Sequence, residues 1–279
     1  MAQLIGGVGV PHTPHFPGIV DRGEPLAAEI GELYGRAANW LRQARPDVLV
    51  FFTCDHYYNF FVESIPIFAI GVAESARGPG DYRELRQYEV RVHAPLARRV
   101  QAHLVQAGFD VGMSQEFELD HPVTVPLHFL TPGMGVPIVP VFINGLIPPL
   151  APAWRCHALG TAIGAALAGE PDEPGGPLRV AAIASGSFSL EIGGPRISAH
   201  SHTGVPDLDW FDHVLVRLGA GEVGELVKEA TGEQLARAGN AGGELLSWIA
   251  MLGLLDPGPP EFLAAQRDFG HAFGIWGSG

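Results

Sequence analysis

Over the first two thirds of the chain, short runs of β-branched and aliphatic residues alternate with longer segments of helical periodicity. Strands that alternate with helices of this length are typical of layered α/β proteins, so we predict an α/β fold with a mixed central sheet flanked by helices. The predicted strands are Leu4–Val10, Val48–Phe52, Ile65–Ile70, Ile138–Ile143 and Leu178–Ile183. The predicted helices are Pro25–Gln43, Tyr88–Ala107 and Trp154–Ala168.

The last third of the chain has a different pattern. From Leu208 onward helical periodicity dominates, and we predict a helical C-terminal third. No internal repeat and no linker separates this region from the rest, so the prediction is a single domain that spans residues 1–279. The predicted C-terminal helices are Trp210–Leu218, Val223–Ala230, Gly232–Ala236, Glu244–Leu254 and Glu261–Phe269.

Two segments rich in glycine and proline predict breaks in regular structure. Glu74–Tyr82 contains Gly78-Pro79-Gly80, which is expected to continue neither a helix nor a strand, and it follows His56 closely in the chain. Two interpretations of this segment stay open, a flap near His56 and a plain surface turn. Glu170–Pro177 is predicted to be a surface turn.

The composition narrows the class of protein. With 279 residues, of which 47% are hydrophobic and 17% charged, the chain can bury a large core. Its formal net charge of −13 argues against nucleic acid as a partner, because phosphate binding needs clustered basic residues. No apolar run approaches the roughly 20 residues that cross a membrane. Cys54 and Cys156 are too few for a disulfide framework, and we expect a cytoplasmic protein without a targeting segment.

Two histidines stand where apolar, strand-like runs end. His12 follows the run that ends at Val10, and His56 follows the run that ends near Phe52. Because the strand ends of an open α/β sheet form the rim where such folds build their sites, we expect both imidazoles on that rim. Glu244 begins an apolar helix, and two neutral imidazoles with one carboxylate are the set that holds non-haem Fe(II) with positions left open. The alternative is that each histidine caps a strand or bonds a backbone carbonyl.

Five short motifs follow one another from about residue 5 to residue 253. They are His12-Thr13-Pro14, Asp55-His56, Asp120-His121-Pro122-Val123-Thr124-Val125-Pro126-Leu127, Gly194-Pro195-Arg196 and Gly243-Glu244-Leu245. In order and approximate spacing this set resembles the class III extradiol ring-cleavage dioxygenases, in particular the LigB-type catalytic beta subunit of protocatechuate 4,5-dioxygenase.

The resemblance implies an Fe(II)-dependent enzyme that opens a small aromatic ring and incorporates both atoms of O2. By motif, the iron ligands of the family fall on His12, His56 and Glu244. The implied substrate is catechol-, gallate- or aminophenol-like, and the implied assembly is a homo-oligomer or a complex with a small subunit. A metal-binding subunit without activity and a divalent-metal hydrolase are the alternative functions.

One position departs from the family pattern. The family carries an acid/base histidine shortly before Gly-Pro-Arg, and the aligned residue here is Leu190, which cannot carry a proton. We predict His121 as the replacement, because a histidine can take and return a proton near neutral pH. The alternatives are a structural His121 bonded to Asp120 or to a backbone group, and a substrate that arrives already ionised. Further candidates for the base are His128, Tyr57 and Tyr58. Residues predicted to contact the substrate or to support the ligands are Asp55, Tyr58, His128, Ser189 and Leu190.

Overall fold

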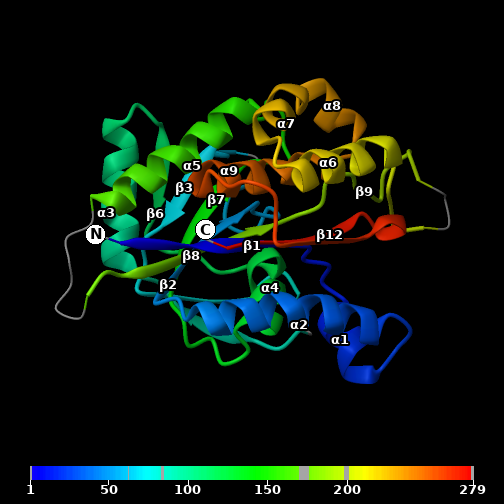
Figure 1. The fold of residues 1–279 in the computed structure, drawn as a ribbon, viewed down its shortest axis with the longest axis horizontal. Helices are drawn as coiled ribbons and strands as arrows, with labels where there is room; N and C mark the ends of the chain where they lie inside the picture. Colours follow the sequence, from blue (N-terminus) through cyan, green and yellow to red (C-terminus); the bar gives the residue numbers. More distant parts are fainter. Residues whose placement is uncertain (1, 62, 83–84, 170–175, 198–200, 278–279) are drawn as a thin grey trace.

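The structure is a computed structural model, and it describes residues 2–61, 63–82, 85–169, 176–197 and 201–277. Within these residues, an eight-stranded mixed sheet forms the centre of the molecule (Figure 1). Its strands are β1 (Gln3–Val10), β2 (Val48–Thr53), β3 (Phe68–Gly71), β6 (Val111–Ser114), β7 (Ile138–Ile143), β8 (Arg179–Ser185), β11 (Phe262–Gln266) and β12 (His271–Gly277). They lie in the order β11-β12-β1-β8-β2-β7-β3-β6.

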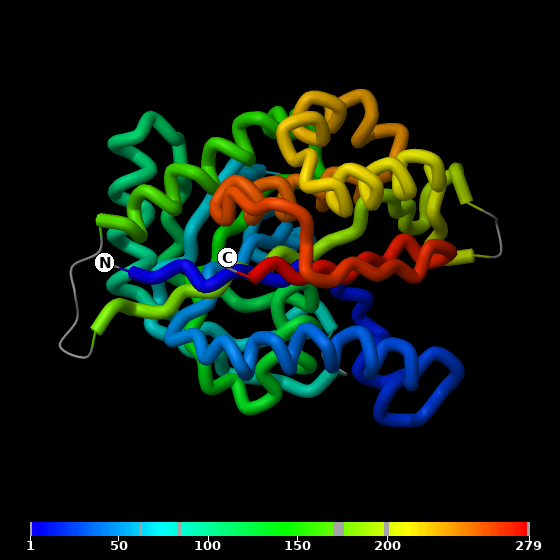
Figure 2. The backbone as a smooth tube through the Cα atoms, viewed as in Figure 1, coloured from blue at the N-terminus to red at the C-terminus, as the bar shows by residue number. Residues whose placement is uncertain are grey.

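The middle of the sheet brings several strand ends to one edge. β1, β8, β2 and β7 run parallel, so their carboxyl ends meet there. β12 pairs with β1 in the antiparallel sense, which places the first residue of β12 at the same edge. Figure 2 shows these two strands, the blue N-terminal one and the red C-terminal one, side by side. Residues just beyond β1, β2 and β8 and at the start of β12 therefore come together.

Helices cover both faces of the sheet (Figure 1). Val50 and Phe52 of β2 pack in one hydrophobic core and Leu49 and Phe51 in the other, because successive strand residues point to opposite faces. This double burial explains why β2 appears in the sequence as an unbroken apolar run. On one face lie α3 (Ala94–Gln106), α5 (Ala153–Ala168), α6 (Leu208–Ala220), α7 (Val223–Glu229), α8 (Gly232–Arg237) and α9 (Leu245–Leu255); on the other lie α1 (Phe16–Arg22), α2 (Ala27–Ala44) and α4 (His121–Leu130).

Helix α9 is buried from Leu245 to Leu254 and lies directly against α5. A Cβ atom at Gly160 of α5 would stand 1.9 Å from the carbonyl oxygen of Ala250. Because no side chain fits there, glycine is what lets the two helix backbones touch. This contact fixes the start of α9, where the 3-10 turn η1 (Gly242–Glu244) presents Glu244.

Two small two-stranded sheets lie outside the main one. β4 (Ser75–Gly78) and β5 (Tyr88–Arg91) form an antiparallel hairpin, and β9 (Glu191–Ile192) pairs with β10 (Thr203–Gly204). A second 3-10 turn, η2 (Arg267–Phe269), connects β11 to β12.

The predicted α/β fold is confirmed, and each of the five predicted strands corresponds to a strand of the main sheet. The helix predicted over Tyr88–Ala107 begins only at Ala94, since the first residues form β5. The helix predicted over Glu261–Phe269 is wrong, because this segment forms β11 and η2. Pairing of β11 with β12, as between Ala264 and Phe273, overrides the local helical preference of alanine and leucine.

The two predicted breaks have different outcomes. Glu74–Tyr82 is not irregular throughout, since it contains β4. Most of the turn predicted at Glu170–Pro177 lies outside the described residues. Among the helices that the structure describes, none has the length and apolar character needed to cross a bilayer. The single domain over residues 1–279 stays a prediction.

Candidate metal site

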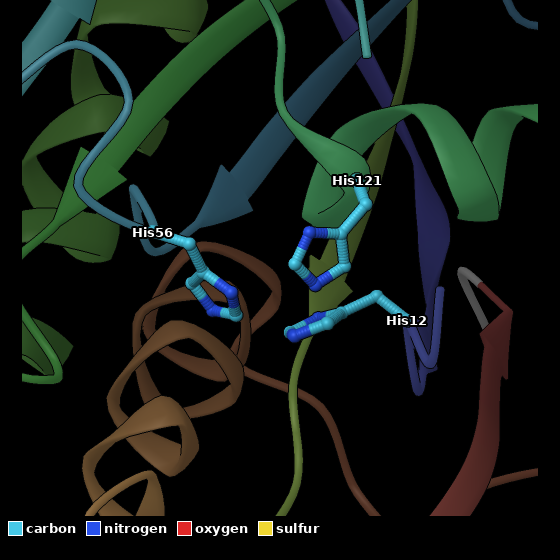
Figure 3. Close-up of side chains that lie close together, drawn as sticks. All are labelled: His12, His56 and His121. Carbon is cyan, nitrogen blue, oxygen red and sulfur yellow. The ribbon is translucent and has the colours of Figure 1, made fainter. Parts of the chain in front are cut away.

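Three imidazoles converge at the edge where β1 and β2 end. Figure 3 shows the rings of His12, His56 and His121 pointing toward one another. The ring centroids are 5.1 Å apart for His12 and His56, 4.7 Å for His56 and His121, and 5.4 Å for His12 and His121. Each ring offers a nitrogen that lies within 4.8 Å of the other two, so the cluster can hold a metal ion.

Glu244 brings a carboxylate to the same point. Its Oε1 lies 3.3 Å from Nε2 of His12 and 3.2 Å from Nε2 of His56, and its Oε2 accepts a hydrogen bond of 2.8 Å from the backbone N–H of Ser187. Burial alone would raise the pKa of this fully buried carboxyl, but the two imidazoles beside it hold its pKa well below the usual range. The position just before α9 also favours the ionised form, because the amino end of a helix attracts negative charge.

The ring of His12 is held in one orientation by Ser185, the last residue of β8. The Ser185 hydroxyl donates to the carbonyl oxygen of Pro122 at 2.8 Å, so its oxygen is left to accept from Nδ1–H of His12 at 2.6 Å. With the proton on Nδ1, Nε2 of His12 keeps its lone pair and faces Glu244. A hydrogen bond of this kind on the far nitrogen is what orients and tunes metal-binding histidines.

The turn that carries His56 is built on Asp55. The Asp55 carboxylate accepts backbone N–H groups of Tyr58, Asn59 and Phe60, each at 3.0 Å. Such side-chain to backbone bonds replace the ladder that ends with β2 and fix the path of the chain. Asp55 therefore fixes the turn that carries His56, and its role toward a substrate stays a prediction.

A second carboxyl group supports His56 from α4. Oδ2 of Asp120 accepts the backbone N–H of His56 at 2.8 Å. Burial raises the pKa of the Asp120 carboxyl to about 8. Asp120 thus links the amino end of α4 to the turn after β2, and it does not bond the ring of His121.

His121 is the first residue of α4, and its partner is Asp81. Oδ1 of Asp81 accepts the backbone N–H of His121 at 3.0 Å, and Oδ2 pairs with the ring Nδ1. Burial lowers the pKa of His121 to about 3, so the ring is neutral. The edge of the Tyr82 ring lies against the same imidazole, with centroids 5.0 Å apart.

One family of known proteins matches almost the whole chain. A family model described as the catalytic LigB subunit of aromatic ring-opening dioxygenase covers residues 6–276. The chain belongs to this family. The resemblance found in the sequence motifs is thereby confirmed, and the converging histidines are those of its first three motifs.

One curated relative is a 2,3-dihydroxyphenylpropionate/2,3-dihydroxicinnamic acid 1,2-dioxygenase of Paraburkholderia xenovorans. It is 34% identical over 188 residues, and the match covers 67% of this chain and 56% of that protein. A protein of the same name from a Mycobacterium species is 38% identical over 144 residues, 51% of this chain and 45% of the other. The chain spans about half the length of the curated relatives it matches. This structure also resembles the crystal structure of an uncharacterized protein from Escherichia coli K12, with a TM-score of 0.57 and 13% sequence identity. The match covers 98% of this chain and 100% of that one, and it shows that the two chains share a fold.

Two predicted residues of this LigB-family chain make hydrogen bonds with residues outside the imidazole cluster. The Tyr58 hydroxyl donates to Glu118 at 2.6 Å. His128, seven residues beyond His121 on α4, pairs through Nδ1 with the hydroxyl of Tyr88. Contact of Tyr58 or His128 with a substrate stays a prediction.

The segment around Leu190, where the sequence motifs predict a missing acid/base histidine, is anchored by its backbone. Leu190 donates its N–H to the carbonyl of Ala238 at 2.8 Å, and its own carbonyl accepts from Ala241 at 3.0 Å. The buried Ser189 hydroxyl donates to Ala238 at 3.1 Å and accepts from the N–H of Asp207 at 3.1 Å. Both residues tie β8 to the turn before Glu244, and their role toward a substrate stays a prediction.

Sequence reasoning missed three residues that support the site. Ser185 lies at the end of β8, two residues past the predicted strand, and Asp81 lies in a segment considered only as a loop. His271 begins β12, a strand that the sequence pattern does not predict, and its Nε2 pairs with the hydroxyl of Thr13 at 2.8 Å. Burial lowers the pKa of His271 to about 3. A correct prediction of β12 would have placed this histidine opposite the turn after β1.

Proposed function

We propose that this chain is a non-haem Fe(II)-dependent extradiol-type ring-cleavage dioxygenase, which acts on a small catechol-, gallate- or aminophenol-like substrate and incorporates both atoms of O2. The observation that carries the proposal is the approach of two imidazole nitrogens to one buried carboxylate oxygen, at 3.2 and 3.3 Å. Family membership and the names of the related proteins support the same reaction class.

The residues present fit a ferrous ion held by His12, His56 and Glu244. The donor set is two neutral nitrogens and one anionic oxygen, which is the set that binds Fe(II) on one face and leaves the other face open. The hydrogen bond between Nδ1 of His12 and Ser185 leaves Nε2, the nitrogen that faces Glu244, for the metal. When bound, Fe(II) supplies the electron transfer between an aromatic diol and O2. The protein residues supply binding, orientation and proton transfer.

His121 is the residue we assign to proton transfer. Its ring lies against both proposed histidine ligands, and because Asp81 occupies Nδ1, the other ring nitrogen is left to accept a proton. The proton that leaves a substrate hydroxyl goes to the free ring nitrogen of His121, and the same nitrogen can return it later. The largely buried cluster limits the access of water to this exchange.

Oxygen uptake tests the proposal. The protein is loaded with Fe(II) without air, its iron content is measured, and a panel of catechols, gallate and aminophenols is added with O2. We expect uptake with at least one substrate and loss of it in Glu244→Gln, whereas Glu225→Gln on the exposed side of α7 keeps it. Iron-loaded protein that consumes no oxygen across the panel would contradict the proposal.

One observation favours a second candidate, a divalent-metal hydrolase. His12, His56 and His121 also form a three-nitrogen set, and three histidines are a frequent ligand set for catalytic zinc. Turnover that needs zinc and no oxygen would identify this alternative. A subunit without activity is disfavoured by the retention of all the donors. The cytoplasmic location and the assembly, as a homo-oligomer or with a small subunit, remain predictions.

A further inference from the structure

The interaction between Asp81 and His121 has two points of contact. One carboxylate oxygen accepts the backbone N–H that starts α4, and the other meets the ring Nδ1. The side chains are 14% and 8% exposed, so water competes little for either group. Two contacts from one carboxylate fix both the position of the His121 backbone and the rotation of its ring.

The pairing also determines where the ring proton lies. A carboxylate can only accept, so a neutral imidazole that bonds it through Nδ1 carries its proton on Nδ1. Nε2 then has a free lone pair. Because Nδ1 is taken by Asp81, Nε2 is the nitrogen that His121 offers to the cluster with His12 and His56.

The hairpin of β4 and β5 holds Asp81 in place. The N–H of Leu119 donates to the carbonyl of Arg77 at 2.7 Å, and the N–H of Gly80 donates to the carbonyl of Leu119 at 3.0 Å. A Cβ atom at Gly78 would stand 2.2 Å from the Leu119 carbonyl oxygen, so the two segments touch backbone to backbone. These backbone contacts hold the segment that leads to Asp81 against the segment that leads to His121.

We propose that Asp81 is a positioning residue that holds His121 as the Nδ1–H tautomer with Nε2 directed to the substrate, so that this pair replaces the histidine lost at Leu190. The role in catalysis rests on the proposed function, whereas the tautomer does not. In the reaction, Nε2 takes the proton of the substrate hydroxyl, and the Asp81 carboxylate stays ionised beside the resulting imidazolium. A carboxylate that orients a histidine in this way is the arrangement of the serine protease triad.

The first test is heteronuclear NMR of the histidine ring nitrogens in metal-free protein, with the His121 signals assigned by their loss in His121→Gln. We expect the wild type to carry the His121 proton on Nδ1. In Asp81→Asn we expect a shift toward the Nε2–H form, and Asp81→Glu should keep the wild-type tautomer. Wild-type protein with the proton on Nε2, or an unchanged tautomer in Asp81→Asn, would overturn the proposal whether or not the enzyme turns over.

The second test is kinetic and uses iron-loaded protein. Acid–base groups contribute about 100-fold or more to rate, so kcat of Asp81→Asn should fall by at least about 100-fold with KM and iron content nearly unchanged. Asp81→Glu should recover part of the loss. Glu89→Gln removes one charge from the same hairpin without touching His121 and should behave as wild type. A loss that follows the iron content or the thermal stability, or a normal kcat in Asp81→Asn, would contradict the assigned role.

Discussion

At the scale of single residues, the site depends on groups that decide which imidazole nitrogen faces the cluster. Ser185 does this for His12 and Asp81 for His121, in each case by bonding Nδ1. Sequence motifs identified the histidines and Glu244 because each of these residues lies in a short local motif. Ser185 and Asp81 were not predicted, because they contact these histidines only when β8 and the β4–β5 hairpin are folded against the site.

Ser185→Ala tests the support of His12. Without the hydroxyl, the ring loses the bond that selects its tautomer, and loss of such a partner typically weakens metal binding by about 10- to 100-fold. Competition with a chelator under anaerobic conditions measures the affinity for Fe(II). Ser114→Ala, at the end of the edge strand β6, serves as the control and should leave the affinity unchanged.

Leu190→His tests whether this position still belongs to the reaction. If the pocket retains the family arrangement, a histidine here adds an acid/base group and raises turnover on protocatechuate-like substrates. Steady-state oxygen uptake of the variant and the wild type gives the comparison. No gain, or a loss on the best substrate, would indicate that Leu190 instead shapes a different pocket.

At the scale of elements, the strands that end at the site were predictable and the C-terminal pair was not. The sequences of β1 and β2 are largely apolar runs, and the strands predicted from them are present in the structure. The segment Phe262–Gln266 reads locally as a helix and becomes β11 only through its pairing with β12. β11 is an edge strand of the sheet, and no local pattern in its sequence indicates its pairing with β12.

Gly160→Ala tests the contact between α5 and α9 that positions Glu244. The added Cβ would stand 1.9 Å from the Ala250 carbonyl, so α9 must shift, and overpacking of this kind costs about 1–3 kcal/mol. Gly164→Ala in the same helix meets its nearest atom at 3.4 Å and should be neutral or stabilising. Urea denaturation gives the free energy of unfolding, and equal values for the two variants would contradict the packing argument.

At the scale of the whole molecule, a buried neutral histidine couples folding to pH. His271 titrates near 6.5 when unfolded, and burial lowers its pKa to about 3 in the folded protein. Between these two pKa values the unfolded state binds more protons than the folded state. The contribution of neutral His271 to the free energy of unfolding is therefore complete above about pH 6.5 and is lost as the pH falls toward 3, by up to about 1.4 kcal/mol per pH unit.

The free energy of unfolding of His271→Gln should therefore depend less on pH than that of the wild type. The free energies of unfolding of the variant and the wild type, measured from pH 7 to pH 5, are expected to converge as the pH falls. His103→Gln, on the exposed side of α3, should stay parallel to the wild type. Parallel curves for His271→Gln would show that this histidine is not held neutral by burial.

We expect His12 after β1, His56 after β2 and Glu244 in the turn η1 before α9 to hold one ferrous ion. An experimental structure of the protein after anaerobic loading with Fe(II) tests it most directly. We predict one iron per chain bound by Nε2 of His12, Nε2 of His56 and the carboxylate of Glu244, with His121 nearby but not bound. An iron bound by His121 in place of Glu244, or no ion at this edge of the sheet, would contradict the account.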